Sequence, residues 1–144
     1  MGTVARSVLV RRPVDAVAKV ATHPEEVFPI MGAFGKFDLI AETADGSQEW
    51  DLYLDVGTIH VGGRVLVEPP AGPILAWRSR RGTHHSGRIE VSPAEGGALV
   101  TMSVTVEFAG LLAGWFTGLL AQGILGRHIE AGLEQLRHHI EYGT

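Results

Sequence analysis

Residues 36–108 most constrain the fold, because they hold six consecutive strand-like segments with no helical segment between them. In residues 49–56 every second side chain, beginning with Trp50, is apolar and the others are polar, which is typical of a strand that buries one face. The Gly62-Gly63 pair predicts a bulge that bends the sheet. Turn-forming residues separate the segments. We therefore predict an antiparallel meander of six strands over residues 36–43, 47–56, 58–69, 74–80, 84–93 and 98–108.

One more strand and two short helices are predicted before this meander. Residues 3–11 alternate between apolar and polar side chains, which indicates a strand. A proline then supplies the fixed φ of a helix start, and residues 14–21 follow as a short helix. A second short helix is predicted over residues 24–32, with Thr22 and Glu25 spaced as a capping box.

The chain ends in a predicted helix of about thirty residues. Apolar side chains at helical spacing form one stripe, Ile129, Leu133, Leu136 and Ile140, which extends backwards through Gly126, Gln122, Leu119, Trp115 and Leu112. Residues 108–126 contain nineteen uncharged residues, so a membrane span is the alternative. Five glycines in that stretch, and an amphipathic pattern that continues into the charged end of the chain, favour a buried helix.

Composition excludes several functional classes. The 144 residues suit one domain, residues 1–144. The net charge is −4 and no run of lysine or arginine exceeds two residues, so we expect no nucleic-acid partner. The chain has no cysteine, which suits a cytoplasmic location, and its N-terminus lacks the apolar stretch of a signal peptide. No metal-binding, nucleotide-binding or serine-hydrolase motif is present, so we expect neither a metal nor a cofactor.

The order of elements and three local sequences resemble a known superfamily. The sequences are VLVRRPVDAVAKVATHPEEV, SPAEGGALVTMSVTVEF and GLLAGWFTGLLAQGILGRHIEAGLEQLRHHIE. They are similar to the polyketide cyclase/dehydrase-like branch of the SRPBCC, or START-like (Bet v 1-like), superfamily. The resemblance implies an α+β helix-grip fold: a curved seven-stranded antiparallel sheet wrapped around a long C-terminal helix, with two short helices after the first strand. It also implies an apolar cavity between sheet and helix, and it carries over no catalytic residue.

The candidate ligand-binding residues are those predicted on the dry sheet face and on the inner helix stripe. Gln122 is the polar group expected to need a partner inside, since an unpaired buried amide is costly. His85 shares its strand face with Ile89, so we expect it to face the cavity and to titrate near neutrality. The full set is Trp50, Leu52, Leu54, Trp77, His85, Ile89, Met102, Val104, Trp115, Leu119, Gln122 and Gly126.

Three functions remain open at this point. The preferred hypothesis is binding of a hydrophobic or amphipathic small molecule, such as a lipid, a polyketide or an aromatic compound. The first alternative is a cyclase or dehydratase that acts on a polyketide-like substrate in the same cavity, which would require two or more titratable groups converging there. The second is an interaction module with a filled core and no ligand. The sequence leaves the oligomeric state open, a homodimer included.

Overall fold

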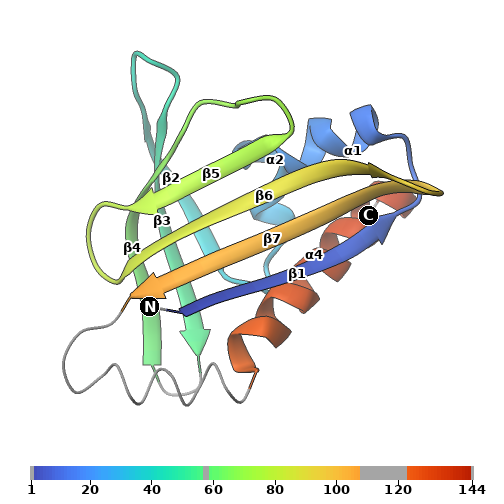
Figure 1. Ribbon diagram of the computed structural model, residues 1–144. Helices are drawn as coiled ribbons and strands as arrows, with labels where there is room; N and C mark the ends of the chain where they lie inside the picture. Colours follow the sequence, from blue (N-terminus) through green and yellow to red (C-terminus); the bar gives the residue numbers. More distant parts are fainter. Residues whose placement is uncertain (1, 57–58, 108–122, 144) are drawn as a thin grey trace.

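The computed structural model describes residues 2–56, 59–107 and 123–143, and its elements follow the predicted order (Figure 1). The first strand and two short helices are β1 (Gly2–Val10), α1 (Val14–Ala21) and α2 (Pro24–Ile30). Six strands follow, namely β2 (Lys36–Glu42), β3 (Gln48–Val56), β4 (Ile59–Val67), β5 (Ile74–Ser79), β6 (His84–Ala94) and β7 (Gly97–Glu107). The chain closes with the helix α4 (Ile124–Tyr142).

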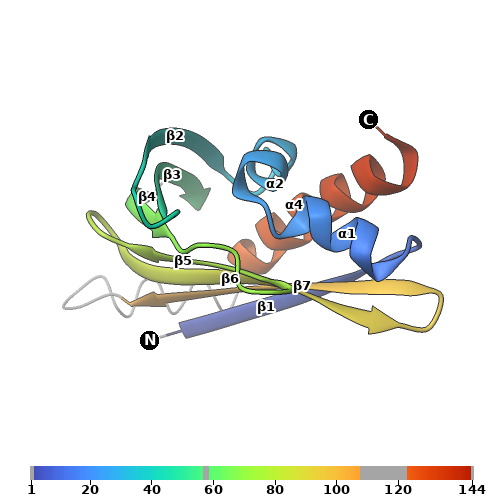
Figure 2. The same cartoon turned by 90° about the horizontal axis from the view of Figure 1, so that it is seen from above.

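The seven strands form one antiparallel sheet in the order β1-β7-β6-β5-β4-β3-β2. The first strand therefore returns to pair with the last one, while the other strands form a meander. The described helices α1, α2 and α4 all cover the same face of the sheet (Figure 2). This arrangement confirms the α+β helix-grip fold, with a curved sheet around a C-terminal helix.

The sheet changes direction where β4 meets β5. Only Val65, Leu66 and Val67 of β4 pair with β5, whereas β6 and β7 pair along their whole length. The short ladder leaves β2, β3 and β4 free to run steeply across the direction of β6 and β7 (Figure 1). The curvature gives the sheet a concave face, and the helices lie against it (Figure 2).

The predicted bulge at Gly62-Gly63 is wrong, because β3 and β4 pair there without a register shift. The glycines instead allow a close backbone approach. A Cβ at Gly63 would overlap the carbonyl oxygen of Arg81, and the N–H of Thr83 donates to the carbonyl of Gly62 at 3.0 Å. The turn between β5 and β6 thus lies directly against β4. The register shift in the sheet lies in β2, between Leu39 and Ala41.

The capping box predicted at the start of α2 is also wrong. The residue that caps the helix is His23, without a side-chain hydrogen bond. The Thr22 hydroxyl donates backwards to the carbonyl of Ala18 at 2.6 Å, which ends α1. The Glu25 carboxylate instead accepts a hydrogen bond from Gln48 of β3 at 2.7 Å, so it ties α2 to the sheet.

The C-terminal helix is shorter than predicted. It begins at Ile124 and contains 19 residues, because Gly123 adopts a left-handed conformation with φ of +73° and breaks the helical backbone there. An unbroken helix through this point is therefore wrong. The apolar stripe predicted after the break is confirmed, since Ile129, Leu133 and Leu136 are buried. Leu112, Trp115, Leu119 and Gln122 lie outside the described residues.

Candidate functional site

The described candidate residues gather on the concave face of the sheet, as their alternation along the strands requires. None of the eight sheet residues is more than 8% exposed. They come from four strands: Trp50, Leu52 and Leu54 from β3, Trp77 from β5, His85 and Ile89 from β6, and Met102 and Val104 from β7. Three further candidates, Trp115, Leu119 and Gln122, are outside the described residues.

An aromatic cluster from α2 fills the concave space over β3 and β5. Phe28 stacks on Phe37 of β2 with ring centroids 4.1 Å apart and planes 7° apart. The same Phe28 meets Trp50 edge to face at 5.0 Å and Trp77 at 5.7 Å. The two edge-to-face distances are those of favourable aromatic pairs. This part of the expected cavity is therefore packed with side chains.

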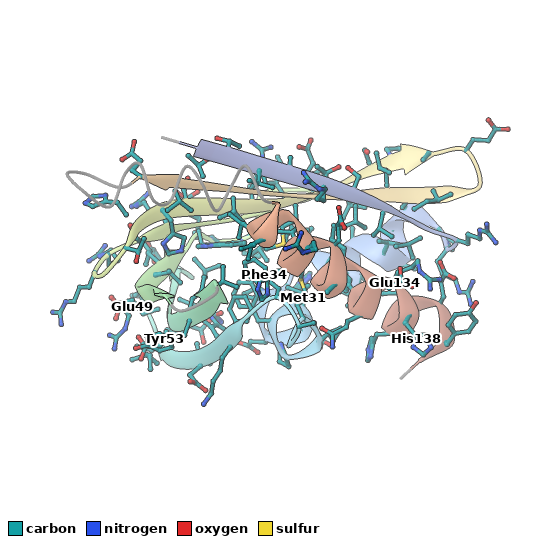
Figure 3. All side chains as sticks on the ribbon, turned by 90° about the horizontal axis from the view of Figure 1, so that it is seen from below. Met31, Phe34, Glu49, Tyr53, Glu134 and His138 are labelled. Carbon is teal, nitrogen blue, oxygen red and sulfur yellow. The ribbon has the colours of Figure 1, made fainter. Side chains whose placement is uncertain are left out.

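Sequence reasoning missed the residues that pack α4 against this cluster. In Figure 3, Met31 and Phe34 lie between α4 and the strands, whereas Glu134 and His138 lie on the outward side of α4. A Cβ at Gly132 of α4 would lie 2.7 Å from Phe34 and 2.9 Å from Met31, so the missing side chain lets α4 approach closely. The available signal was the apolar spacing of Phe28 and Met31 in the second helix.

Trp77 lies across Gly87 of the neighbouring strand. The two residues are paired in the ladder, and a Cβ at Gly87 would overlap the indole ring. The indole is buried, since only 2% of Trp77 is exposed, and its Nε1–H has no acceptor among the described residues. By contrast, the indole N–H of Trp50 donates to the Gln48 side chain at 2.9 Å. Burying an unpaired N–H costs roughly 1–3 kcal/mol.

His85 is the second buried group that lacks a partner. It is 8% exposed, and it is buried on the strand face that also carries Ile89. Its Nδ1 lies 2.9 Å from the carbonyl oxygen of Thr83, and its backbone N–H donates to the Ser79 hydroxyl at 3.1 Å. No described residue contacts its Nε2 by a hydrogen bond. Burial lowers the pKa of His85 below its ordinary value of 6.5, an effect that the Thr83 bond partly opposes.

The two unpartnered nitrogens belong to the same end of the concave face. His85 is diagonal to Trp77 across the β5–β6 ladder, since Trp77 pairs with Gly87. Diagonal residues of this kind lie roughly 7–8 Å apart, within reach of one another's longer side chains. His85 also pairs with Val106, one residue before the end of β7. The fold therefore places Trp77 and His85, each with one unpartnered nitrogen, as diagonal neighbours on adjacent strands.

Gly126 has a different surrounding from the one predicted. A Cβ there would overlap Nη2 of Arg6 and lie 3.2 Å from its Nε. The Arg6 guanidinium also pairs with Glu130 at 2.8 Å, one turn further along α4. Gly126 therefore makes room for an arginine of β1, and the space above it is occupied by that side chain.

Several of the hollows at the surface are formed by described residues. A groove of about 700 Å³ runs between α2 and α4 past Ile30 and His139. A smaller hollow of about 240 Å³ lies among four glutamates and His23. A third, of about 370 Å³, is lined by His85 and by outward residues of β5, β6 and β7, including Arg78, Ser86 and Thr105. Within the described ranges, no three His, Asp or Glu side chains are grouped as metal ligands, and no helix is long and apolar enough to cross a membrane.

Known proteins share this architecture. A family model described as polyketide cyclase/dehydrase and lipid transport matches residues 1–141. No curated protein sequence matches the chain. Solved structures share the fold at low identity. The protein TTHA0849 from Thermus thermophilus is 16% identical, with a TM-score of 0.80 and 99% of both chains covered.

Two further solved structures carry more descriptive names. The Zhui aromatase/cyclase from Streptomyces sp. R1128 is 20% identical, with a TM-score of 0.66, and the match covers 97% of this chain and 93% of that one. A START superfamily protein from Mycobacterium smegmatis is 16% identical, with a TM-score of 0.71 and 99% of both chains covered. At these identities the likeness concerns the fold.

Proposed function

Because the chain belongs to the polyketide cyclase/dehydrase and lipid transport family, we propose that it binds a hydrophobic or amphipathic small molecule on the concave face of its sheet. The observation that carries this proposal is the pair of buried nitrogens without partners, Nε1 of Trp77 and Nε2 of His85. Buried polar groups in proteins are almost always hydrogen-bonded, so two exceptions at one end of an apolar face suggest a ligand that supplies the missing partners.

Apolar surface would provide most of the affinity. Leu75, Ile89, Met102 and Val104 are buried on the same three strands, β5, β6 and β7, and are at most 3% exposed. Removing apolar ligand surface from water contributes about 25 cal/mol per Å². The two nitrogens would fix the orientation of the ligand, in the way that a few polar groups do in mostly apolar pockets.

We propose binding rather than catalysis because the described strands of this region carry one buried titratable side chain. Proton transfer in a cyclase or dehydratase would require an acid and a base within reach of one substrate. Among the buried polar side chains of the described residues, His85 is the one titratable group on β5, β6 or β7. A single imidazole can orient a ligand without any chemical step.

A titration with 2-naphthol, a fused-ring aromatic with one hydroxyl, tests this proposal. We expect one equivalent to bind by calorimetry and to shift the ¹⁵N–¹H signal of the Trp77 indole, because the ligand supplies its missing acceptor. Native mass spectrometry of protein purified from its own host should also detect a bound small molecule. The proposal is contradicted if no small molecule is detected with the purified protein and the Trp77 signal does not respond to 2-naphthol.

Two variants make the titration specific. Trp77→Phe removes the unpartnered N–H and keeps an aromatic ring, so we expect it to weaken binding about 5- to 10-fold, the value of one ordinary hydrogen bond. Tyr53→Phe is the matched control, because it removes one polar atom from a side chain that is 47% exposed. Equal affinities in the two variants would place the ligand elsewhere on the molecule.

A further inference from the structure

The hydrogen bond between His85 and Thr83 determines which imidazole nitrogen carries the proton. A backbone carbonyl only accepts, so the 2.9 Å contact requires a hydrogen on Nδ1. Burial of His85 favours its neutral form. In a neutral imidazole with Nδ1 protonated, Nε2 carries a lone pair and acts only as an acceptor. The unpartnered atom of His85 therefore needs a hydrogen-bond donor.

Trp77 has the opposite requirement. An indole Nε1–H donates and never accepts, and this one has no acceptor among the described residues. The concave face thus presents one donor and one acceptor on adjacent strands, both more than nine-tenths buried. A ligand that satisfies both must itself accept one hydrogen bond and donate another.

We infer that the ligand is a neutral hydrophobic molecule with a hydroxyl head group, a phenol or an alcohol, which donates its O–H to Nε2 of His85 and accepts from Nε1 of Trp77. This inference rests on the proposed function. A hydroxyl oxygen can accept and donate at once, so one group meets both demands. An ether or a ketone meets only that of Trp77. A carboxylate brings a charge into an apolar site and places a lone pair against the lone pair of His85.

Three naphthalenes that differ only in their head group test this inference at about neutral pH. They are 2-naphthol, which donates and accepts, 2-methoxynaphthalene, which only accepts, and 2-naphthoate, which accepts and is charged. We expect 2-naphthol to bind about tenfold more tightly than the methyl ether, since sites built around a hydroxyl reject analogues without it. We expect 2-naphthoate to bind more weakly than either.

The imidazole itself provides a readout that needs no variant. Long-range ¹H–¹⁵N correlations of the wild-type protein should show the Nδ1–H tautomer of His85, and 2-naphthol but not its methyl ether should shift the Nε2 signal. His85→Leu should remove the preference for the naphthol, while His84→Gln, on the outward side of the same strand, should keep it. If His85→Leu does not fold, the tautomer measurement on the wild-type protein still decides the question.

The outcomes separate this inference from the function on which it rests. If all three naphthalenes bind with similar affinity and shift the Trp77 signal, the protein binds hydrophobic molecules but does not select a hydroxyl, and the inference is wrong. An Nε2–H tautomer in wild-type protein would also overturn it. If none of the three binds, the proposed function itself fails.

Discussion

Gly87 controls where the Trp77 indole lies, because the ring occupies the space that any other residue's Cβ would take. A Cβ at this position would overlap three ring atoms. We predict that Gly87→Ala displaces the indole and destabilises the protein by about 1–3 kcal/mol, as overpacking in a core does. Denaturant unfolding would measure the loss, and the near-ultraviolet circular dichroism of the tryptophans would report the displacement.

The control for this substitution is Gly32→Ala. Gly32 has no heavy atom within 4 Å of its Cβ position and is not among the glycines with positive φ. The same change in chemistry there should leave stability and the tryptophan signal nearly unaltered. Equal losses in the two variants would show that the close contact between Gly87 and Trp77 does not exist in solution.

His85 should make stability depend on pH above the range in which carboxylates titrate. Its pKa is lowered in the folded state, so the unfolded chain takes up a proton first as pH falls through 6.5. The contribution of His85 is therefore complete above pH 6.5 and is lost progressively below it. Glu134 and Glu141 also have lowered pKa values, but their ordinary value is 4.5, so their losses begin at lower pH.

We predict that the free energy of unfolding falls between about pH 7 and pH 5, and that His85→Gln removes much of this slope. Glutamine keeps a donor for the Thr83 carbonyl but does not titrate. Urea unfolding at a series of pH values measures the slope. The matched variant His84→Gln, with its exposed side chain, should retain it. An unchanged slope in His85→Gln would mean that this imidazole is not buried in its neutral form.

At the residue scale, the alternation of residues along the strands predicted which side chains are buried, but not the hydrogen-bond partners of their polar atoms. The predicted inward side chains Trp50, Trp77 and His85 are all buried, because the period of two in a strand leaves no other choice once one face is apolar. Whether each polar atom finds a partner depends on neighbours distant in sequence. Gln48 reaches the Trp50 indole, and no described residue reaches that of Trp77. No local pattern encodes this difference.

At the scale of elements, one carboxylate fastens the end of α4 to the end of β1. Glu141 accepts a hydrogen bond from the backbone N–H of Arg11 at 3.0 Å and pairs with Arg137 at 2.9 Å, and its side chain is 6% exposed. The Arg12 guanidinium donates to the Glu141 backbone carbonyl. The carboxylate therefore satisfies a main-chain donor where the strand leaves the sheet.

We predict that Glu141→Ala lowers the melting temperature by several degrees, because it leaves the Arg11 N–H and the Arg137 guanidinium without this acceptor. Glu130→Ala breaks the ion pair between Arg6 and Glu130, whose side chains are 40% and 57% exposed. Exposed pairs contribute little, so this control should have a much smaller effect. Thermal unfolding of both variants provides the comparison. Equal shifts would show that the contact of Glu141 with β1 does not stabilise the fold.

Sequence patterns predicted the elements well and their junctions poorly. Strand bounds agree with the structure to within a residue or two, because turn residues and the period of two both mark them. Gly62-Gly63 serves a contact with the β5–β6 turn, and α4 begins only after Gly123, although the apolar spacing of the sequence continues through that residue. The first depends on a tertiary contact and the second on one left-handed backbone conformation, and the spacing of side chains reports neither.

For the molecule as a whole, the concave face carries a packed aromatic cluster and, beside it, two buried nitrogens without hydrogen-bond partners among the described residues. Phe28 of α2 fills the part over β3 and reaches β5, because it stacks on Phe37 and meets both Trp50 and Trp77 edge to face. The unpartnered nitrogens belong to Trp77, at the border of this cluster on β5, and to His85 on β6. The sequence could predict a concave face. It could not predict which part of that face is filled by side chains, because the filling depends on where α2 packs.

The sheet should be uneven in local stability. β7 lies inside the sheet and is paired along its length with both β1 and β6. β2 is an edge strand that pairs only with β3, its register shifts after Leu39, and most of its side chains are exposed, including Ile40 at 45%. Amides of β2 can therefore exchange through local opening, whereas those of β7 require the sheet to come apart.

We predict that hydrogen–deuterium exchange followed by mass spectrometry shows faster exchange in β2 than in β7, and that β7 exchanges only through global unfolding. Mild denaturant provides the control. It should accelerate β7 in step with the measured unfolding free energy and leave β2 nearly unchanged, because local opening exposes little new surface. Exchange of both strands at one rate, with one denaturant dependence, would mean that the bent sheet unfolds as a single cooperative unit and that its edge has no independent motion.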